Sequence, residues 1–271
     1  MARLADFPPA LRGGGAALAC ASLLLAAPGQ GRTWPSVPFL SAVTIPDWSY
    51  TKDSGPQHWA ELAPTYRPCG GGQRQSPIDL RAPVLAPRKR LSYHYRSSPL
   101  SLANNGRTVW GDEGAGSYLI IGERRYELTR YQFHTPSEHL RHGRRAEMEI
   151  QLQHRDRQGN IAMLAVLVEA GRGANTTLQR IADHLPAPGD VFYGRHVGIN
   201  PVFMLPSDRA HFAYPGSLTT PPCTEGVDWR VLREPLVLDA RLLARFRQAM
   251  GDNARPLQPR NGRPLALHRR P

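Results

Sequence analysis

The sequence predicts a mostly β protein that folds as a single domain. Short runs of apolar or alternating residues are separated by Pro and Gly, a pattern typical of strands and turns. Helical periodicity is confined mainly to two segments. No repeat or low-complexity linker divides the 271 residues, and β folds of this length are commonly one domain.

The candidate strands share a strand-like length and an alternating or wholly apolar pattern. They are LSYHY (91–95), RTVW (107–110), SYLIIG (117–122), YELTRYQFH (126–134), EMEIQLQH (147–154), IAMLAVLVE (161–169), PVFML (201–205) and WRVL (229–232). The candidate helices are TTLQRIADHL (176–185) and DARLLARFRQAM (239–250). In the second, Asp239 is a candidate N-cap, and Leu242, Leu243 and Phe246 fall on one face.

The N-terminal residues 1–30 resemble a secretory signal. Arg3 and Arg12 precede the apolar run AALACASLLLAAP, which is too short to span a bilayer. We therefore expect an exported protein, periplasmic or secreted, with a domain over 34–271 and no transmembrane segment after signal removal. A permanent N-terminal anchor is the alternative.

The cysteines predict one disulfide. Cys20 lies inside the apolar run and leaves with the signal, so Cys69 and Cys223 remain as an even pair in an exported chain. On the chain-entropy view, a bridge over so long a loop contributes about 4–5 kcal/mol. Two free thiols are the alternative.

The formal net charge is +12, and almost all of the basic residues are arginine, with Lys52 and Lys89 the only lysines. The charge clusters are PRKRL (87–91), GERR (122–125), RHGRR (141–145) and LHRRP (267–271). They are scattered along the sequence without an arginine–aromatic repeat, so we expect solvated surface and no nucleic-acid partner. Arginine also suits anionic groups, which leaves an anionic ligand or polymer as a candidate partner.

Several motifs together are similar to those of the α-class carbonic anhydrases, especially the exported bacterial ones, over roughly residues 46–265. The motifs are DWSY, GPQHW, QSPIDL, NNGRTVW, FHTPSEH, AMLAVLVEAG and YPGSLTTPPCTEGVDW. The resemblance implies a central, mostly antiparallel twisted sheet of about ten strands, a few short peripheral helices, and a conical cleft that leads to a zinc ion.

In that family three histidines hold the zinc ion. The matching positions in this sequence are Gln132, His134 and Gln151, so only one of them is a histidine. A carboxamide offers only a weakly basic carbonyl oxygen, which is better suited to hard cations. We therefore expect no tightly bound cofactor, and zinc only if the family activity is retained.

The resemblance assigns roles to other residues. Thr219 and Glu138 match the pair that orients the zinc-bound hydroxide, and Arg107 stands at the usual proton-shuttle histidine. Tyr50 matches a tyrosine of the cleft's solvent network, while Glu149, His139 and His154 match residues behind the ligands. The matching pocket residues are Gln153, Met163, Leu218, Thr220 and Trp229.

Three functions follow as hypotheses. The favoured one is an exported carbonic-anhydrase-like protein that has lost zinc-dependent CO2 hydration and has a binding role. The second is an active or residual enzyme with an atypical ligand set, and the third is a polyanion-binding surface protein.

Overall fold

The structure is a computed structural model that describes residues 47–87, 89–112 and 116–269. These residues lie within one compact unit, Ile45–Pro271. The predicted signal, with Arg3, Arg12 and Cys20, lies outside the described residues. None of the helices in the described part of the chain is both long and apolar enough to cross a membrane.

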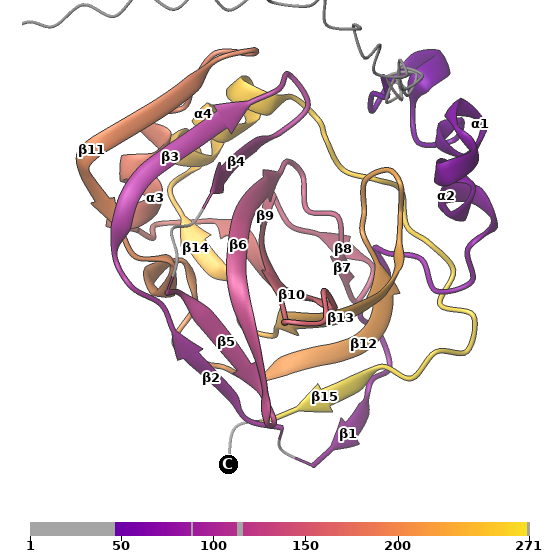
Figure 1. Cartoon of the computed structure of the whole chain (residues 1–271). Helices are drawn as coiled ribbons and strands as arrows, with labels where there is room; N and C mark the ends of the chain where they lie inside the picture. Colours follow the sequence, from indigo (N-terminus) through magenta and orange to yellow (C-terminus); the bar gives the residue numbers. More distant parts are fainter. Residues whose placement is uncertain (1–46, 88, 113–115, 270–271) are drawn as a thin grey trace, which may run out of the picture. The chain divides into compact units, whose positions relative to one another are not determined.

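Most of the strands belong to one large twisted sheet of 13 strands (Figure 1). Ten of them follow the order β1-β15-β12-β13-β10-β9-β6-β4-β3-β11, while β14 pairs with β10, β5 with β6, and β2 with β5. The strands are β1 (Val84–Ala86), β2 (Leu91–His94), β3 (Ser98–Asn104), β4 (Val109–Asp112), β5 (Tyr118–Ile121), β6 (Arg124–His134), β9 (Met148–Arg155), β10 (Ile161–Ala170), β11 (Val191–Ile199), β12 (His211–Ser217), β13 (Glu225–Leu232), β14 (Leu236–Leu238) and β15 (Ala266–His268).

The predicted mostly antiparallel sheet is confirmed, although three pairs of strands are parallel. The parallel pairs are β1 with β15, β10 with β13, and β10 with β14. A separate two-stranded hairpin of β7 (Leu140–Arg141) and β8 (Arg144–Arg145) is formed by the RHGRR segment. His142 and Gly143 turn this hairpin with positive φ angles of 53° and 79°.

The helices are few and short, as the sequence predicts. They are α1 (Trp59–Leu62), α2 (Pro68–Gly71), α3 (Thr176–Ala182) and α4 (Ala240–Met250), with the 3-10 turns η1 (Lys52–Ser54), η2 (Pro64–Tyr66) and η3 (Pro201–Met204). The N-cap prediction for α4 is confirmed, because the Asp239 side chain accepts from the Arg241 amide. Leu242, Leu243 and Phe246 are buried on its inner face.

The prediction of a strand at PVFML is wrong, because this segment forms η3. Asn200 caps it by accepting from the Val202 amide, and Pro201 occupies the first turn, where a missing N–H costs nothing. The sequence interpretation also missed β3, β11 and β12. Gly194 and Gly198 interrupt β11, whose register shifts between them.

Alternation along β9 separates an apolar face from a polar one. Met148, Ile150 and Leu152 join the main core cluster, in which Phe133 packs against Phe246 of α4 with ring centroids 4.9 Å apart. Since successive side chains of a strand point to opposite faces, the intervening Glu149, Gln151 and Gln153 face the other way. This second face holds the site.

The predicted disulfide joins Cys69 and Cys223, which are 154 positions apart. It ties α2 to the loop between β12 and β13. Both cysteines are buried with Trp59 and Tyr66 in a small cluster of their own.

Candidate functional site

The candidate site is built on two neighbouring antiparallel strands. In the pairing of β6 with β9, Gln132 lies opposite Gln151 and His134 lies opposite Glu149. His134, Glu149 and Gln151 are fully buried, and so is Glu138, which follows β6 in the chain. We call Gln132, His134, Glu138, Glu149 and Gln151 the amide cluster.

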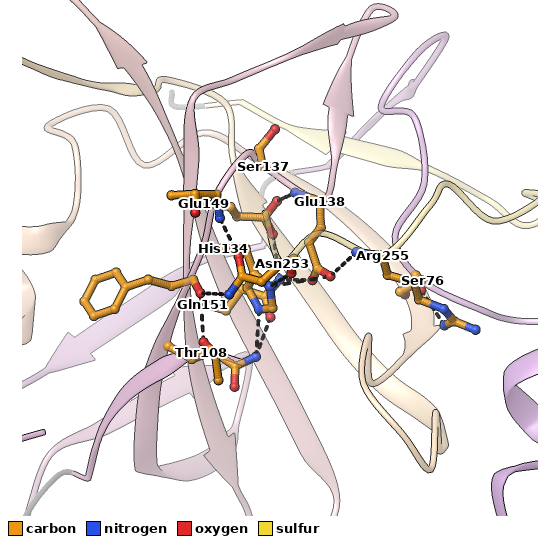
Figure 2. A network of polar contacts seen from close by, with 12 residues as sticks. Ser76, Thr108, His134, Ser137, Glu138, Glu149, Gln151, Asn253 and Arg255 are labelled. Atoms are coloured by element: carbon orange, nitrogen blue, oxygen red, sulfur yellow. Dashed lines mark hydrogen bonds and ion pairs between the residues drawn. The ribbon is translucent and has the colours of Figure 1, made fainter. Parts of the chain in front are cut away.

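Hydrogen bonds fix the orientation of the Gln151 carboxamide. Its Nε2 group donates to Glu138 Oε2 at 2.8 Å and to Glu149 Oε1 at 3.0 Å (Figure 2). An ionised carboxylate only accepts hydrogen bonds, so the Gln151 amino group faces these oxygens and its carbonyl faces Gln132. Gln132 Nε2 then donates to Gln151 Oε1 at 2.9 Å.

The same network sets the tautomer of His134. Its Nε2 atom lies 3.1 Å from Gln132 Nε2, which carries hydrogens, so the imidazole accepts at this position. Its Nδ1 atom donates to the Asn253 carbonyl oxygen at 2.9 Å. The lone pair with which a neutral imidazole binds a metal is therefore directed at an amide hydrogen.

The Glu149 carboxylate holds the cluster together by accepting several hydrogen bonds. Its carboxylate accepts from the Glu138 amide, the His139 amide, His139 Nδ1 and Gln151 Nε2, all at 2.8–3.0 Å. Burial acts to raise the pKa of Glu149, but the charge and hydrogen bonds of His139 outweigh burial and lower that pKa to about 2. Glu149 is therefore ionised at neutral pH.

A C-terminal segment that the sequence interpretation missed closes the cluster. Asn253 accepts from His134 and, through its side-chain oxygen, from the Thr135 amide at 2.7 Å. The Arg255 amide donates to Glu138 Oε1 at 2.9 Å, while its guanidinium bonds the Gln75 side chain and the Ser76 and Cys69 carbonyls. Burial lowers the pKa of Arg255 to about 10. The segment carries no periodic pattern that would have indicated this role.

A polar cleft of about 440 Å³ adjoins the cluster, and Gln132 is the cluster member that lines it. The other lining residues are Thr129, Arg130, Gln153, Arg155, Met163, Leu218, Thr219, Thr220 and Pro221. The expected pocket residues Gln153, Met163, Leu218 and Thr220 line this cleft, and so does Thr219, which was expected in the orienting pair. The sequence interpretation missed Arg130 and Arg155, although Arg155 continues the period-2 series of Gln151 and Gln153.

Other expected site residues lie elsewhere. Trp229 is fully buried in the core, where its indole nitrogen donates to the Ser217 carbonyl at 2.9 Å, and it does not line the cleft. His154 is buried on the opposite face of β9 and contacts the Tyr95 hydroxyl at 2.8 Å. His139 lies behind the cluster, between Glu149 and the Tyr214 hydroxyl.

Arg107 and Tyr50 are also outside the cleft lining. Arg107 pairs with Asp47 at 2.5 Å and lies over the Trp48 ring. Tyr50 packs edge-on against Trp48 and Trp59, and burial raises the pKa of its phenol.

The expected hydrogen bond from Thr219 to Glu138 is not among those of the described residues. Glu138 accepts instead from the Arg255 amide and from Gln151 Nε2.

The convergent donors do not fit a tightly held zinc ion. Catalytic zinc is held by imidazole, thiolate or carboxylate ligands. Here one imidazole lone pair is used by Gln132, and the two remaining groups are carboxamides. Across residues 47–87, 89–112 and 116–269, no group of three or more His, Cys, Asp or Glu side chains is arranged to hold a metal ion.

The fold and the strand-borne site define a class: a mostly β protein whose polar cleft opens beside the middle of one large sheet. The sequence profile of the family described as "Eukaryotic-type carbonic anhydrase" matches residues 54–269. The chain therefore belongs to the α-type carbonic anhydrase family.

Three relatives illustrate the likeness. A carbonic anhydrase of Nostoc sp. is 37% identical over 237 residues, which is 83% of this chain and 89% of the relative. The α-carbonic anhydrase of Thermovibrio ammonificans, solved with the inhibitor sulfanilamide, superposes with a TM-score of 0.79 at 37% identity and covers 82% of this chain and 99% of its own. Dioscorin complexed with ascorbate superposes with a TM-score of 0.76 at 32% identity, covering 83% and 99%.

Proposed function

We propose that this chain is an exported member of the α-type carbonic anhydrase family in which zinc-dependent CO2 hydration is lost or strongly reduced. The observation that carries the proposal is the closed hydrogen bonding at the three positions that match the zinc ligands. Gln151 donates to two carboxylates, Gln132 donates to Gln151, and His134 accepts from Gln132. Each group already has a partner that a metal would have to displace.

The loss of the metal would remove the nucleophile. Water bound to zinc in a carbonic anhydrase has a pKa of about 7, whereas the pKa of bulk water is far higher. Without the cation, almost no hydroxide forms at neutral pH. Arg107 adds a second obstacle, because a guanidinium does not give up its proton at neutral pH and this one is engaged by Asp47.

The cleft then serves for binding an anionic ligand. Arg130 and Arg155 supply positive charge to its lining, and Gln132, Gln153, Thr219 and Thr220 supply neutral hydrogen-bonding groups. Arginine forks suit carboxylate, sulfate and phosphate groups. A related fold solved as dioscorin complexed with ascorbate supports a ligand-binding role for a member of this family. Binding of a polyanion, the alternative function, would use the same positive charge. It would also need a basic surface that extends beyond this one cleft.

The test restores the two imidazoles. Gln132→His with Gln151→His is expected to retain about one zinc ion per chain after dialysis, while the wild type retains far less. CO2 hydration should rise from near background in the double variant, because Glu149 remains to support a ligand at position 151. Adding Arg107→His should raise turnover further in weak buffer, where proton export limits the rate.

A matched control separates ligand geometry from the mere addition of imidazoles. Gln132→His with Gln153→His adds the same number of histidines to the cleft, but residue 153 lies opposite Arg130 and away from His134. This control should neither retain zinc nor hydrate CO2. Robust hydration by the wild type, lost with a chelator and recovered with zinc, would refute the proposal and favour an active enzyme with an atypical ligand set.

A further inference from the structure

Two basic segments from distant parts of the sequence meet in one pocket, contrary to the expectation of scattered surface charge. Residues of PRKRL and of LHRRP line a cavity of about 250 Å³ together with residues of β2, β15 and the start of β12. We call this the basic pocket. Its lining residues are Lys89, Arg90, Leu91, Tyr93, Arg209, His211, His268 and Arg269.

Strand alternation places the two histidines on the same face of the sheet. Phe212 of β12 and Leu267 of β15 belong to a second core cluster on the other face, so their neighbours His211 and His268 point the opposite way, and His211 lies opposite Leu232 of the main core cluster. The two histidines are directly paired across the strands, and their ring centroids are 5.0 Å apart. The floor of the pocket is therefore fixed by the sheet.

The lining is strongly cationic. Six of its eight residues are Lys, Arg or His, and no carboxylate is among the lining residues that the structure describes. Asp208, which precedes Arg209 in the chain, is engaged by Arg233. Like charges held close together without acids between them repel one another unless an anion joins them.

The pocket contains buried polar atoms without a hydrogen-bond partner among the described residues. Nε2 of His211 and the hydroxyl oxygen of Tyr93 are of this kind. His211 is only 2% exposed, and its Nδ1 donates to the Arg209 carbonyl at 3.1 Å. Its Nε2 atom therefore carries a lone pair that lacks a donor, while the Tyr93 hydroxyl is a donor that lacks an acceptor.

The surroundings keep His211 neutral. Burial, followed by the positive charges of Arg230, His268 and Lys89, lowers the pKa of His211 to about 4. At neutral pH the pocket thus offers several cationic donors, one neutral hydroxyl and one buried acceptor. A single anion that still carries a proton would satisfy all of them.

We infer that the basic pocket binds inorganic phosphate as the hydrogenphosphate ion. Its unprotonated oxygens accept from the cationic side chains and from Tyr93, and its remaining P–OH group donates to His211 Nε2. Sulfate has the same shape but no proton at neutral pH, and a phosphate monoester dianion lacks one too. Both would leave His211 Nε2 unsatisfied, and a site built around a hydrogen bond rejects ligands that cannot make it.

The inference is independent of the proposed function and is tested by calorimetric titration of the whole chain at pH 7.5. Phosphate should bind with one site per chain and at least about tenfold more tightly than sulfate or methyl phosphate. Lys89→Ala with Arg269→Ala should weaken phosphate binding at least about tenfold. The control Arg172→Ala with Arg195→Ala removes the same charge from exposed positions outside the pocket and should leave binding unchanged.

A second variant tests the acceptor itself. His211→Asn keeps a donor near the Arg209 carbonyl and removes the Nε2 lone pair, so phosphate affinity should fall to that of sulfate while sulfate affinity stays the same. Absence of phosphate binding by the wild type at millimolar concentration would overturn the inference. So would equal affinity for phosphate and sulfate, tighter binding of methyl phosphate, or an equal loss in the Arg172/Arg195 control.

Discussion

The amide cluster and the basic pocket both bury polar side chains against the same sheet, but they differ in how those side chains are satisfied. In the cluster, Gln151 and Glu149 find all of their partners within the chain. In the basic pocket, His211 Nε2 and the Tyr93 hydroxyl find none among the described residues, and the surrounding charge has one sign. The first arrangement stabilises the fold, whereas the second is unfavourable until something binds.

The comparison predicts that removing Glu149 has the largest effect on stability. Glu149→Ala leaves the Glu138 amide, the His139 amide and His139 Nδ1 without an acceptor, and we expect a loss of about 3–5 kcal/mol in the free energy of unfolding. Denaturant titration measures it. Glu123→Ala, at an exposed position, should change stability by less than about 0.5 kcal/mol. A small effect of Glu149→Ala would mean that the cluster is not the stabilising element described here.

Replacing Gln151 should lower the stability of the fold more than replacing Gln132 does. Gln151→Leu deprives Glu138 and Glu149 of a buried donor and is expected to cost about 2–3 kcal/mol. Gln132→Leu, at a half-buried cleft position, should cost about 1 kcal/mol or less. The double variant should be more stable than the sum of the single effects predicts, since the two side chains contact each other. Strict additivity would contradict the hydrogen bond between them.

Lowering the pH should reduce the free energy of unfolding, partly through His211 of the basic pocket. The folded-state pKa of His211 is about 4, below the usual value of 6.5, so the unfolded chain takes up the proton first as pH falls. Stability from this residue is fully present above pH 6.5 and is lost progressively down to about pH 4. Between pH 7 and pH 5, the free energy of unfolding of the wild type should fall by about 1–2 kcal/mol more than that of His211→Asn. Denaturant titration without phosphate measures both values.

His154 is the internal reference for this comparison. Burial lowers its pKa to about 4 as well, and it stays in both proteins, so its contribution cancels. An identical pH dependence in the wild type and His211→Asn would show that His211 does not titrate as described.

Removing cations from the basic pocket should have the smallest effect on stability, and it should stabilise the protein slightly where the other variants destabilise it. In phosphate-free buffer, Lys89→Ala with Arg269→Ala should leave the free energy of unfolding unchanged or raise it by up to about 0.5 kcal/mol, because like charges are relieved. Thermal unfolding measures the change. A clear loss of stability would indicate that these residues have partners in the fold and that the pocket is not a repulsive site.

Much of the amide cluster could be predicted from the sequence because it rests on local alternation. A period of two along 126–134 and 147–154 places Gln132, His134 and Gln151 on one face, and the family motifs supply the register. The partners from the C-terminal segment could not be predicted in this way. Asn253 and Arg255 reach the cluster from more than 100 positions away, through a segment without regular structure.

The basic pocket was missed for a similar reason. PRKRL and LHRRP look unrelated in the sequence, and only the pairing of β15 with β1 and β12 brings them together. The error at PVFML is of a different kind, because its signals were local. Asn200 followed by Pro201 is a capping pattern that outweighs the apolar run after it.

The place of β1 in the sheet has a consequence for how the chain matures. β1 ends the strand order and pairs with β15, Val84 opposite Ala266. The ribosome makes Ala266 long after Val84, so this pairing is a late event, and such distant pairing slows folding. Until it forms, Val84 and Leu85, which remain 68% and 59% exposed even in the finished sheet, make an open apolar edge. An open edge is a template for another chain, so incomplete chains that stop before Ala266 are the form of this protein most prone to aggregate.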